Sequence, residues 1–535
     1  MRPLESRLST NVFLHVPLQQ SSSSSVREAK RTLQVVFFIP GNPGLIGYYH
    51  PFLALVVRGV LRGEENVGGR GRGHGREKER GFGDAGRKED ENGDGGEGWA
   101  QQTVVVAGFS LGGFDVGDES SPKSKEREEE RAEEEEDLLY PPSFLSQSRH
   151  KQRQKQQENH GNLGDRKGKG TAAEGQQHHR MIYTLREQIE LSYARVQYLV
   201  ERLQEGQKAN ISEQEQEPLQ VEVVLMGHSV GAYIALEIVR LWHERHPQPM
   251  LDPSDTTTAD SHDRDDDTSR ISSLGPSETR DGRSPSWSIS TCILLTPTIQ
   301  DIHLSPSGRL ATPLLSYLPF LPGLAHMLLH AILLRLTPPA WFCLLVSRVT
   351  GMQVGSHGYE TTMAFLRSGR GVKQALFMAQ GEMREIRRDV WGREVWGASH
   401  HNDVMTAEED DRSKSTTSSP RLFFWFAKKD HWIANITKEA IVKSRAADVG
   451  VQRDSFTGSP TNLAVVETEE VVFMPDQMGQ TTARAARIHI LETEAMVHAW
   501  CLDQSEFVAR RVSSWLREVL HADNSMLRDG RSLNR

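Results

Sequence analysis

The sequence predicts an α/β fold in which helices cover both faces of a mostly parallel, doubly wound sheet. Short apolar, β-branched runs alternate with amphipathic helical patterns, and this order builds parallel strand–helix–strand units. The strongest runs are apolar throughout, as expected of strands that are buried on both faces. The expected strands cover residues 9–16, 34–39, 103–107, 221–226, 287–295, 422–427, 471–474 and 488–491.

The expected helices lie between these strands. Their apolar residues recur every three or four positions, which gives each helix one face for the core. The helical segments are 48–61, 182–204, 232–246, 372–388 and 507–520. After the last helix, we expect residues 521–535 to form a frayed tail.

The composition indicates one domain with long insertions rather than several domains. Only 37% of the 535 residues are hydrophobic and the mean hydropathy is −0.53, because apolar blocks are separated by polar, repetitive spacers. Within the spacers, the charge run at 126–137 is expected to be a solvated loop or a single exposed helix. The spacers are disordered insertions over 62–102, 117–178 and 248–286, and a polar linker over 393–420.

Charge and cysteine content exclude several classes of protein. A net charge of −9 and a pI of about 6.2 provide no basic surface for a nucleic acid. The cysteines Cys292, Cys343 and Cys501 lie far apart, so they indicate neither a disulfide framework nor a metal site and are typical of a reducing compartment. Residues 1–20 lack the continuous apolar segment of a secretory signal.

Ser229 is the candidate nucleophile. It occupies the centre of Gly227-His228-Ser229-Val230-Gly231, between a predicted strand and a predicted helix. A serine at such a sharp strand-to-helix turn, a nucleophile elbow, is exposed to substrate, and the helix N-terminus favours negative charge beside it. A second G-x-S-x-G pattern centres on Ser110, but no amphipathic helix follows it. We therefore expect Ser229 to react and the loop of Ser110 at most to line the pocket.

The loop Pro40-Gly41-Asn42-Pro43-Gly44 follows a strong strand and is the candidate for one half of an oxyanion hole. A strand that runs into a Gly/Asn/Pro turn leaves backbone N–H groups free. We expect the N–H groups near Gly41 and Asn42, together with that of Val230 after the nucleophile, to hold the oxyanion. A plain turn is the alternative for this loop.

Asp430 and His498 are the candidate acid and base. A serine hydroxyl needs a histidine to take its proton, and the histidine needs a carboxylate to orient it. Asp430 follows an apolar strand, and His498 lies between a late strand and the last helix, which gives the order Ser, Asp, His. The alternatives are a solvated turn aspartate and a surface or core histidine. This mechanism needs no metal or cofactor.

Three other histidines are weaker candidates for the base. His431 is the immediate neighbour of Asp430, so that carboxylate cannot easily orient it. His489 lies within a predicted strand and is expected to take part in packing. His228, in the elbow, is expected to pack under the nucleophile rather than to transfer protons.

Residues 310–349 predict an apolar helical cap. No Asp, Glu, Lys or Arg occurs from Leu310 to Leu334, which is long enough to span a bilayer. Pro313, Pro319 and Pro322 interrupt the run and disfavour a straight transmembrane helix. The cap either lies buried over the active site or forms a broken helical pair in a lipid surface. We favour the lipid surface, because the run is too apolar for an ordinary exposed lid.

With these residues in place, the chain resembles the lipid droplet-associated hydrolase family, a branch of the α/β-hydrolases. It differs from the family at Gly108–Gly112, where the family usually carries a histidine- and glycine-rich turn, and in its long insertions. The matching blocks are Phe38–Gly44 with Tyr49, Pro51 and Phe52; Gly227–Gly231 with Tyr233; Pro297–Ile299; Ser305–Arg309; Ala311–Leu315; Asp430 with Trp432; and His498 with Ala499.

The resemblance implies an α/β-hydrolase fold and a serine hydrolase that sits on lipid droplets, and on the endoplasmic reticulum membrane before droplets form. It also implies that the stretch 310–346 helps targeting and that the substrates are neutral lipid esters, with sterol esters as one proposed class. Two alternatives stay open. One is a droplet- or endoplasmic reticulum-binding scaffold with a weak or vestigial triad. The other is a soluble small-ester or thioester hydrolase with a buried cap.

Overall fold

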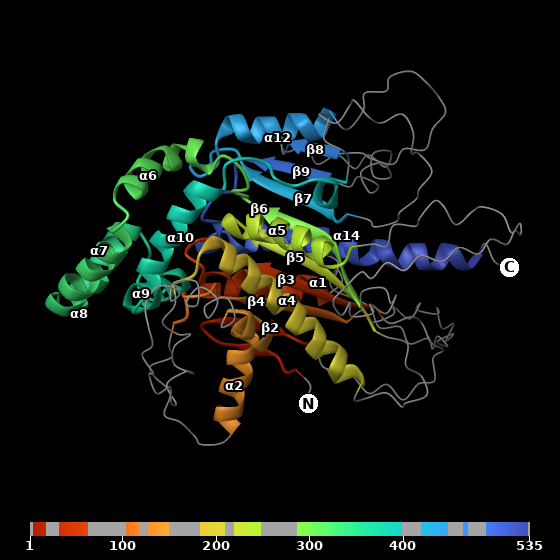
Figure 1. The fold of residues 1–535 in the computed structure, drawn as a ribbon, viewed down its shortest axis with the longest axis horizontal. Helices are drawn as coiled ribbons and strands as arrows, with labels where there is room; N and C mark the ends of the chain where they lie inside the picture. Colours follow the sequence, from red (N-terminus) through yellow and green to blue (C-terminus); the bar gives the residue numbers. More distant parts are fainter. Residues whose placement is uncertain are drawn as a thin grey trace, which may run out of the picture.

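A computed structural model of the chain describes residues 4–17, 32–61, 103–116, 127–148, 182–208, 219–247, 286–397, 419–447, 464–468 and 488–532. The predicted strand 471–474, the predicted insertion 62–102 and the predicted insertion 248–286 up to residue 285 lie outside these residues. In the described part, one sheet has the order β1-β2-β4-β3-β5-β6-β7-β9-β8 (Figure 1). Its strands are β1 (Arg7–Leu8), β2 (Val12–His15), β3 (Thr32–Ile39), β4 (Val104–Phe109), β5 (Gln220–His228), β6 (Trp287–Leu295), β7 (Arg421–Ala427), β8 (Ala464–Thr468) and β9 (Ile488–Thr493).

The sheet is mostly parallel. Strand β2 pairs antiparallel with β1 and β4, and every other adjacent pair is parallel. In β3, β4 and β7 every residue is buried except the first of β3 and the first of β7. This burial explains why the sequence of these strands is apolar throughout rather than alternating. The parallel strands bring their carboxyl ends to one edge of the sheet.

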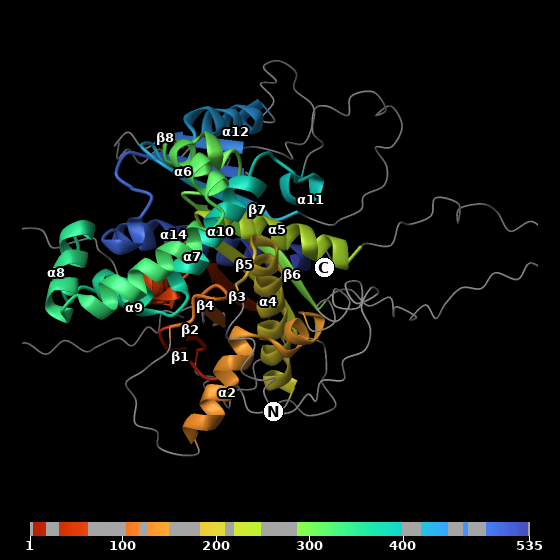
Figure 2. The same cartoon turned by 60° about the vertical axis from the view of Figure 1, so that its left-hand side comes forward.

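Helices cover both faces of the sheet. Helix α1 (His50–Leu61) packs against α14 (Ser505–Ser532) on one face, while α4 (Leu185–Lys208) and α5 (Val230–Arg245) pack together on the other (Figures 1 and 2). Helix α12 (Asn435–Ala447) lies beside β8. The backbone of α14 is helical to Ser532, so the frayed tail predicted from residue 521 is replaced by helix. The chain has the α/β-hydrolase fold.

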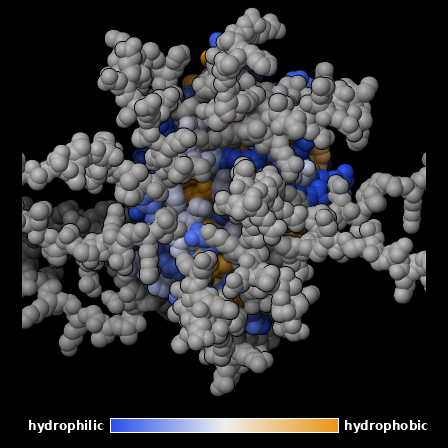
Figure 3. Space-filling model, turned by 90° about the vertical axis from the view of Figure 1, so that its right-hand side faces the viewer, coloured by the Kyte–Doolittle hydropathy of each residue, from blue (hydrophilic) through white to orange (hydrophobic). Residues whose placement is uncertain are grey.

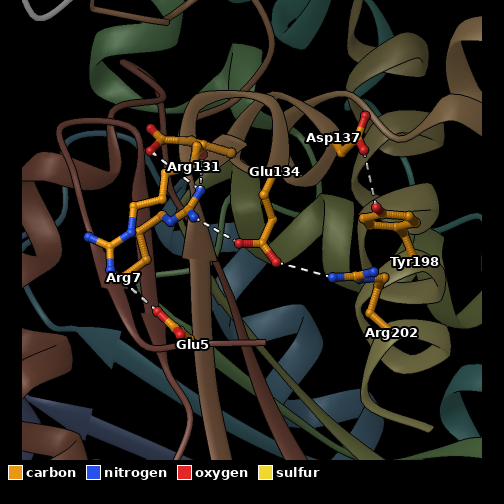
Figure 4. Close-up of polar contacts among 8 residues, drawn as sticks. Glu5, Arg7, Arg131, Glu134, Asp137, Tyr198 and Arg202 are labelled. Atoms are coloured by element: carbon orange, nitrogen blue, oxygen red, sulfur yellow. Dashed lines mark hydrogen bonds and ion pairs between the residues drawn. The ribbon is translucent and has the colours of Figure 1, made fainter. Parts of the chain in front are cut away.

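Part of the predicted disordered insertion 117–178 is ordered on the core. The charge run forms α2 (Arg127–Leu139). Glu134 bridges two arginines, 2.9 Å from Arg7 and 3.1 Å from Arg202, whose side chains are only 13% and 12% exposed (Figure 4). Tyr198 donates a hydrogen bond to Asp137 in the same group. Charge runs usually form solvated faces. This one instead meets arginines from β1 and α4.

The end of α2 is held by the hydrophobic core as well. Leu138, Leu139, Tyr140 and Phe144 are buried. The buried guanidinium of Arg195 donates to the carbonyl oxygens of Leu139 and Ser110, at 2.8 Å each.

The predicted linker 393–420 is also shorter than expected. It begins with α11 (Arg393–Trp396), in which Val395 and Trp396 are buried.

The cap extends from the sheet as a group of helices (Figures 1 and 2). Helix α7 (Leu321–Leu328), which continues into the π-helical turn η5 (Leu329–Leu334), packs against α10 (Gly371–Glu385), which also contacts α6 (Pro306–Tyr317) and α9 (His357–Arg367). In the described residues no single helix is long and apolar enough to cross a membrane, although α6 and the α7–η5 helix qualify jointly, with a 95° bend between them. The name cap, predicted for residues 310–349, is used from here on for this whole group from α6 to α10, which also includes α8 (Pro339–Thr350).

The cap has a small core of its own and a large exposed apolar surface. Leu329, Phe342, Val346, Tyr359 and Met363 form a cluster separate from the main core. On the side of the molecule away from the cap, the described surface shows hydrophilic residues interspersed with small hydrophobic areas (Figure 3). The exposed large apolar side chains on the cap are Leu310, Leu314, Tyr317, Phe320, Leu324, Met327, Leu328, Ile332, Leu336, Trp341, Leu344, Leu345, Val349 and Val354.

Candidate functional site

Ser229 occupies a sharp turn between β5 and α5. Its φ of 54° and ψ of −123° lie outside the regions that non-glycine residues usually adopt. The Ser229 N–H donates to the carbonyl of Leu295 at the end of β6, at 3.0 Å. Gly227 ends the fully apolar part of β5, and a Cβ on Gly231 would overlap the carbonyl oxygen of Ile39 at the end of β3. Close packing of the helix on two strands therefore fixes the turn that the G-x-S-x-G pattern predicts.

Ser229, His498 and Asp430 form one hydrogen-bonded series. His498 Nε2 lies 3.0 Å from Ser229 Oγ, and His498 Nδ1 lies 2.9 Å from Asp430 Oδ2. Because a carboxylate can only accept, Nδ1 carries the proton and Nε2 accepts from the serine hydroxyl. The other carboxylate oxygen of Asp430 accepts from the backbone N–H of Trp432 at 2.8 Å. Both oxygens of this buried carboxylate thus have partners, as burial of a charge requires.

Adjacent parallel strands bring the acid and the base together. Strands β7 and β9 pair directly, and Asp430 and His498 follow their carboxyl ends. The loop that carries His498 is braced by Gln504. The Gln504 side chain donates to the carbonyl of Ala495 and accepts from the N–H of Val497, at 2.8 and 3.0 Å. The imidazole is thereby held on a short, hydrogen-bonded loop.

The weaker candidates for the base and the nucleophile do not take part in this hydrogen-bonded series. His431 is exposed and His489 stacks on Phe423, with 4.5 Å between the ring centroids. Ser110 is completely buried, and its hydroxyl accepts a hydrogen bond from the N–H of Ile46 at 3.1 Å. Its carbonyl accepts from Arg195. Ser110 therefore joins the loop after β4 to η1 (Ile46–Tyr49) and has no access to substrate.

The predicted oxyanion loop needs one correction. The N–H of Gly41 donates to the hydroxyl of Tyr49 at 3.1 Å, so it is already bonded and is not free to hold an oxyanion. Among the described residues, the backbone N–H groups of Asn42 and Val230 have no hydrogen-bond partner. Val230 begins α5, where an intrahelical partner is absent by geometry. Asn42 and Val230 are thus the candidate donors.

Glu382 on α10 is a site residue that sequence reasoning missed. It is buried, and its Oε1 accepts a hydrogen bond of 2.9 Å from the side-chain amide of Asn42. The same amide donates to the carbonyl of Ala375 at 3.0 Å. Burial raises the pKa of Glu382 to about 7, although the Asn42 hydrogen bond opposes the shift. One glutamate in a helix with mixed neighbours carries no sequence signal for such a role.

His228 lies under the nucleophile, as predicted. Its ring is buried, and burial together with the nearby His498 lowers its pKa to about 3, so it is neutral near pH 7. It bonds to the hydroxyl of Tyr49 and the carbonyl of His498. Within the described part of the chain, no group of three or more His, Cys, Asp or Glu residues could hold a metal ion. The cysteines Cys292, Cys343 and Cys501 are free thiols.

A comparison with known protein families gives a match over much of the chain. The model of a family described as lipid-droplet associated hydrolase matches residues 32–469. The match includes the loop at Asn42, the elbow at Ser229 and Asp430, and ends before His498. It covers most of the chain. The chain therefore belongs to the lipid-droplet associated hydrolase family.

Proposed function

We propose that the protein is a serine ester hydrolase that cleaves neutral lipid esters, sterol esters among them, at the surface of lipid droplets and the endoplasmic reticulum membrane. The observation that carries this proposal is the hydrogen-bonded series from Ser229 through His498 to Asp430. Its distances are those at which a serine hydroxyl transfers its proton to a base. The three residues lie at the carboxyl edge of the sheet, where α/β folds position reacting groups.

Each residue has one role in the proposed reaction. Ser229 Oγ attacks the ester carbonyl carbon while His498 Nε2 takes the hydroxyl proton. The tetrahedral intermediate collapses to an acyl-enzyme, and His498 returns the proton to the departing alcohol. Water, deprotonated by the same imidazole, then hydrolyses the acyl-enzyme. Asp430 orients the imidazole and stabilises its cation, and the N–H groups of Asn42 and Val230 stabilise the oxyanion.

The lipid surface in this proposal rests on the family and on the cap. Each of α6, η5 and α8 carries exposed apolar side chains, and Leu310, Trp341 and Val349 are 78%, 71% and 76% exposed. Monomeric proteins rarely expose contiguous apolar patches of this kind unless a partner or a membrane covers them. The bent helices would lie in a droplet monolayer without crossing it. This exposure disfavours the alternative of a soluble hydrolase with a buried cap.

A scaffold that binds lipid without turnover is the second candidate, because the same exposed surface would bind lipid without any reaction. Labelling with a fluorophosphonate separates the two, since only an activated serine reacts. We expect the full-length chain and Ser110→Ala to label at similar rates, and Ser229→Ala and His498→Ala to lose labelling. Folded protein that does not label would support the scaffold. If the native chain does label, a screen of sterol and acylglycerol esters is the next experiment.

A further inference from the structure

A chain of hydrogen bonds joins the three loops of the candidate site beneath the nucleophile. The N–H of Gly41 lies 3.1 Å from the hydroxyl oxygen of Tyr49, and that oxygen lies 2.7 Å from His228 Nδ1. His228 Nε2 lies 2.9 Å from the carbonyl oxygen of His498. The chain begins in the loop after β3, passes through the elbow after β5 and ends in the loop after β9.

The direction of every hydrogen bond in this chain is fixed. The carbonyl of His498 can only accept, so His228 Nε2 must carry a proton. Burial keeps the His228 ring neutral, and its Nδ1 is therefore an acceptor. Tyr49 then donates its hydroxyl proton to Nδ1 and accepts from the N–H of Gly41 with a lone pair. No proton needs to move, and the chain holds the loops in place.

The packing around these groups leaves little freedom. Tyr49 is buried, with its ring centroid 4.7 Å from Phe38 and 5.8 Å from Trp500. The ring of Trp500, two residues after His498, meets His228 edge-on at 5.3 Å. A Cβ on Gly41 would lie 2.8 Å from His228 Nδ1 and 2.9 Å from Ser229 Cβ. Only glycine allows the loop to approach the elbow so closely.

We propose that Tyr49 and His228 form a positioning pair that sets the base His498 and the oxyanion donor Asn42 relative to Ser229. This inference rests on the proposed function. The bond from His228 fixes the peptide group between His498 and Ala499. The bond that Tyr49 accepts from the N–H of Gly41 fixes the Pro40–Gly41 peptide, one residue before the peptide that carries the Asn42 N–H. Neither side chain reacts with substrate. Together they set two distances that the reaction requires: Ser229 Oγ to His498 Nε2, and the Asn42 N–H to the oxyanion.

Tyr49→Phe tests the pair with little loss of packing, because the phenyl ring keeps the contacts of the Tyr49 ring. We expect kcat for an ester and the rate of fluorophosphonate labelling to fall by about 10- to 100-fold, since small misplacements of reacting groups cost up to about 100-fold. KM should stay within about 3-fold, as for an interaction that acts in the transition state. The midpoint of the acid limb of the pH profile should not move, because neither residue of the pair transfers a proton.

Tyr48→Phe is the matched control. Tyr48 is also buried, and its hydroxyl bonds to Thr362 in the cap at 2.9 Å rather than to the pair. We expect this variant to lose similar thermal stability and to label at the native rate. His228 offers a second route. The amide of His228→Gln can replace Nε2 as a donor to the carbonyl of His498, so this variant should label at least about 5-fold faster than His228→Ala.

The outcomes separate this inference from the proposed function. If the native chain does not label, or labels equally in Ser229→Ala, the proposed function itself fails. If labelling depends on Ser229 but Tyr49→Phe labels at the native rate, the positioning pair is overturned and the hydrolase stands. Equal slowing by Tyr48→Phe and Tyr49→Phe would also overturn it, because the effect would then follow any lost buried hydroxyl. Slowing by Tyr49→Phe alone, with partial rescue in His228→Gln, would support the pair.

Discussion

Glu382→Gln is expected to stabilise the protein at neutral and alkaline pH. The Glu382 carboxyl is buried under the Asn42 loop, and its pKa is raised to about 7 from 4.5, chiefly by burial. Among the described residues its hydrogen-bond partner is the neutral amide of Asn42, and no cation bonds to it. Glutamine keeps an amide oxygen that can accept from Asn42, but it never ionises. The substitution therefore removes the cost of a buried charge and retains the contact.

The sign and size of the effect follow from the two pKa values. In the unfolded chain the carboxyl loses its proton near its ordinary pKa of 4.5, whereas in the folded chain it keeps the proton up to about pH 7. The unfolded state thus binds fewer protons between these values, and the free energy of unfolding falls as the pH rises through this window. The difference between a pKa of 4.5 in the unfolded chain and about 7 in the folded chain corresponds to a loss of ~3 kcal/mol in the free energy of unfolding, at 1.36 kcal/mol per pH unit.

Denaturant unfolding of the native chain and Glu382→Gln at about pH 4, 6 and 8 measures this effect. The two proteins should have similar midpoints near pH 4. Between about pH 4 and pH 7 the native chain should lose stability, so the advantage of the variant over the native chain should increase steadily. A matched control is Glu360→Gln, which removes an exposed carboxylate from α9. The reasoning is refuted if Glu382→Gln gives the same difference at all three pH values, or if the variant is less stable than the native chain at about pH 8.

Two further predictions concern the candidate acid and the cap. Asp430→Asn should lower kcat by about 10³- to 10⁴-fold in steady-state assays while the fold is kept, because an amide favours the wrong imidazole tautomer; a loss below about 10-fold would argue against Asp430 as the acid. The triple variant Leu310→Ser, Leu344→Ser, Val349→Ser should lose more than about 10-fold in binding to triolein droplets coated with phospholipid, because each buried side chain contributes ~1.5–3 kcal/mol. Its unfolding midpoint should change little, since all three side chains are exposed; unchanged droplet binding would contradict a lipid-facing cap.

The residues of the candidate site differ in how far the sequence predicts them. Ser229, Asp430 and His498 are predictable because each follows an apolar strand in an order that the α/β-hydrolase topology requires. The two G-x-S-x-G patterns are also separable, because only the one at Ser229 is followed by an amphipathic helix. The structure agrees with this distinction, because Ser110 is buried and bonded: its hydroxyl accepts from the N–H of Ile46, and its carbonyl accepts from Arg195.

Glu382 and the Tyr49–His228 pair have no such signal. Their environment arises from contacts between segments that are far apart in the sequence, such as those of Asn42 and Glu382, which are separated by 340 in residue number. The error at Gly41 has the same origin, since the N–H that a Gly/Asn/Pro turn leaves free is taken by a tyrosine from the following helical turn. A helix was one of the two alternatives for the charge run, but the attachment of α2 to the core was not predicted, because composition describes a charge run and not the arginines that it meets.

The attachment of the cap couples the apolar surface to the candidate site. In the first turn of α6, the N–H of Ser307 donates to the carbonyl of His431, the residue after Asp430, at 2.8 Å. Helix α10 is joined to Asn42 through Glu382. The cap is thus bonded to the loop of the candidate acid Asp430 and to the loop of the candidate oxyanion donor Asn42. A rotation of the cap on a lipid surface would have to break these hydrogen bonds or move both loops, so the orientation of the cap and the geometry of the candidate site are not independent.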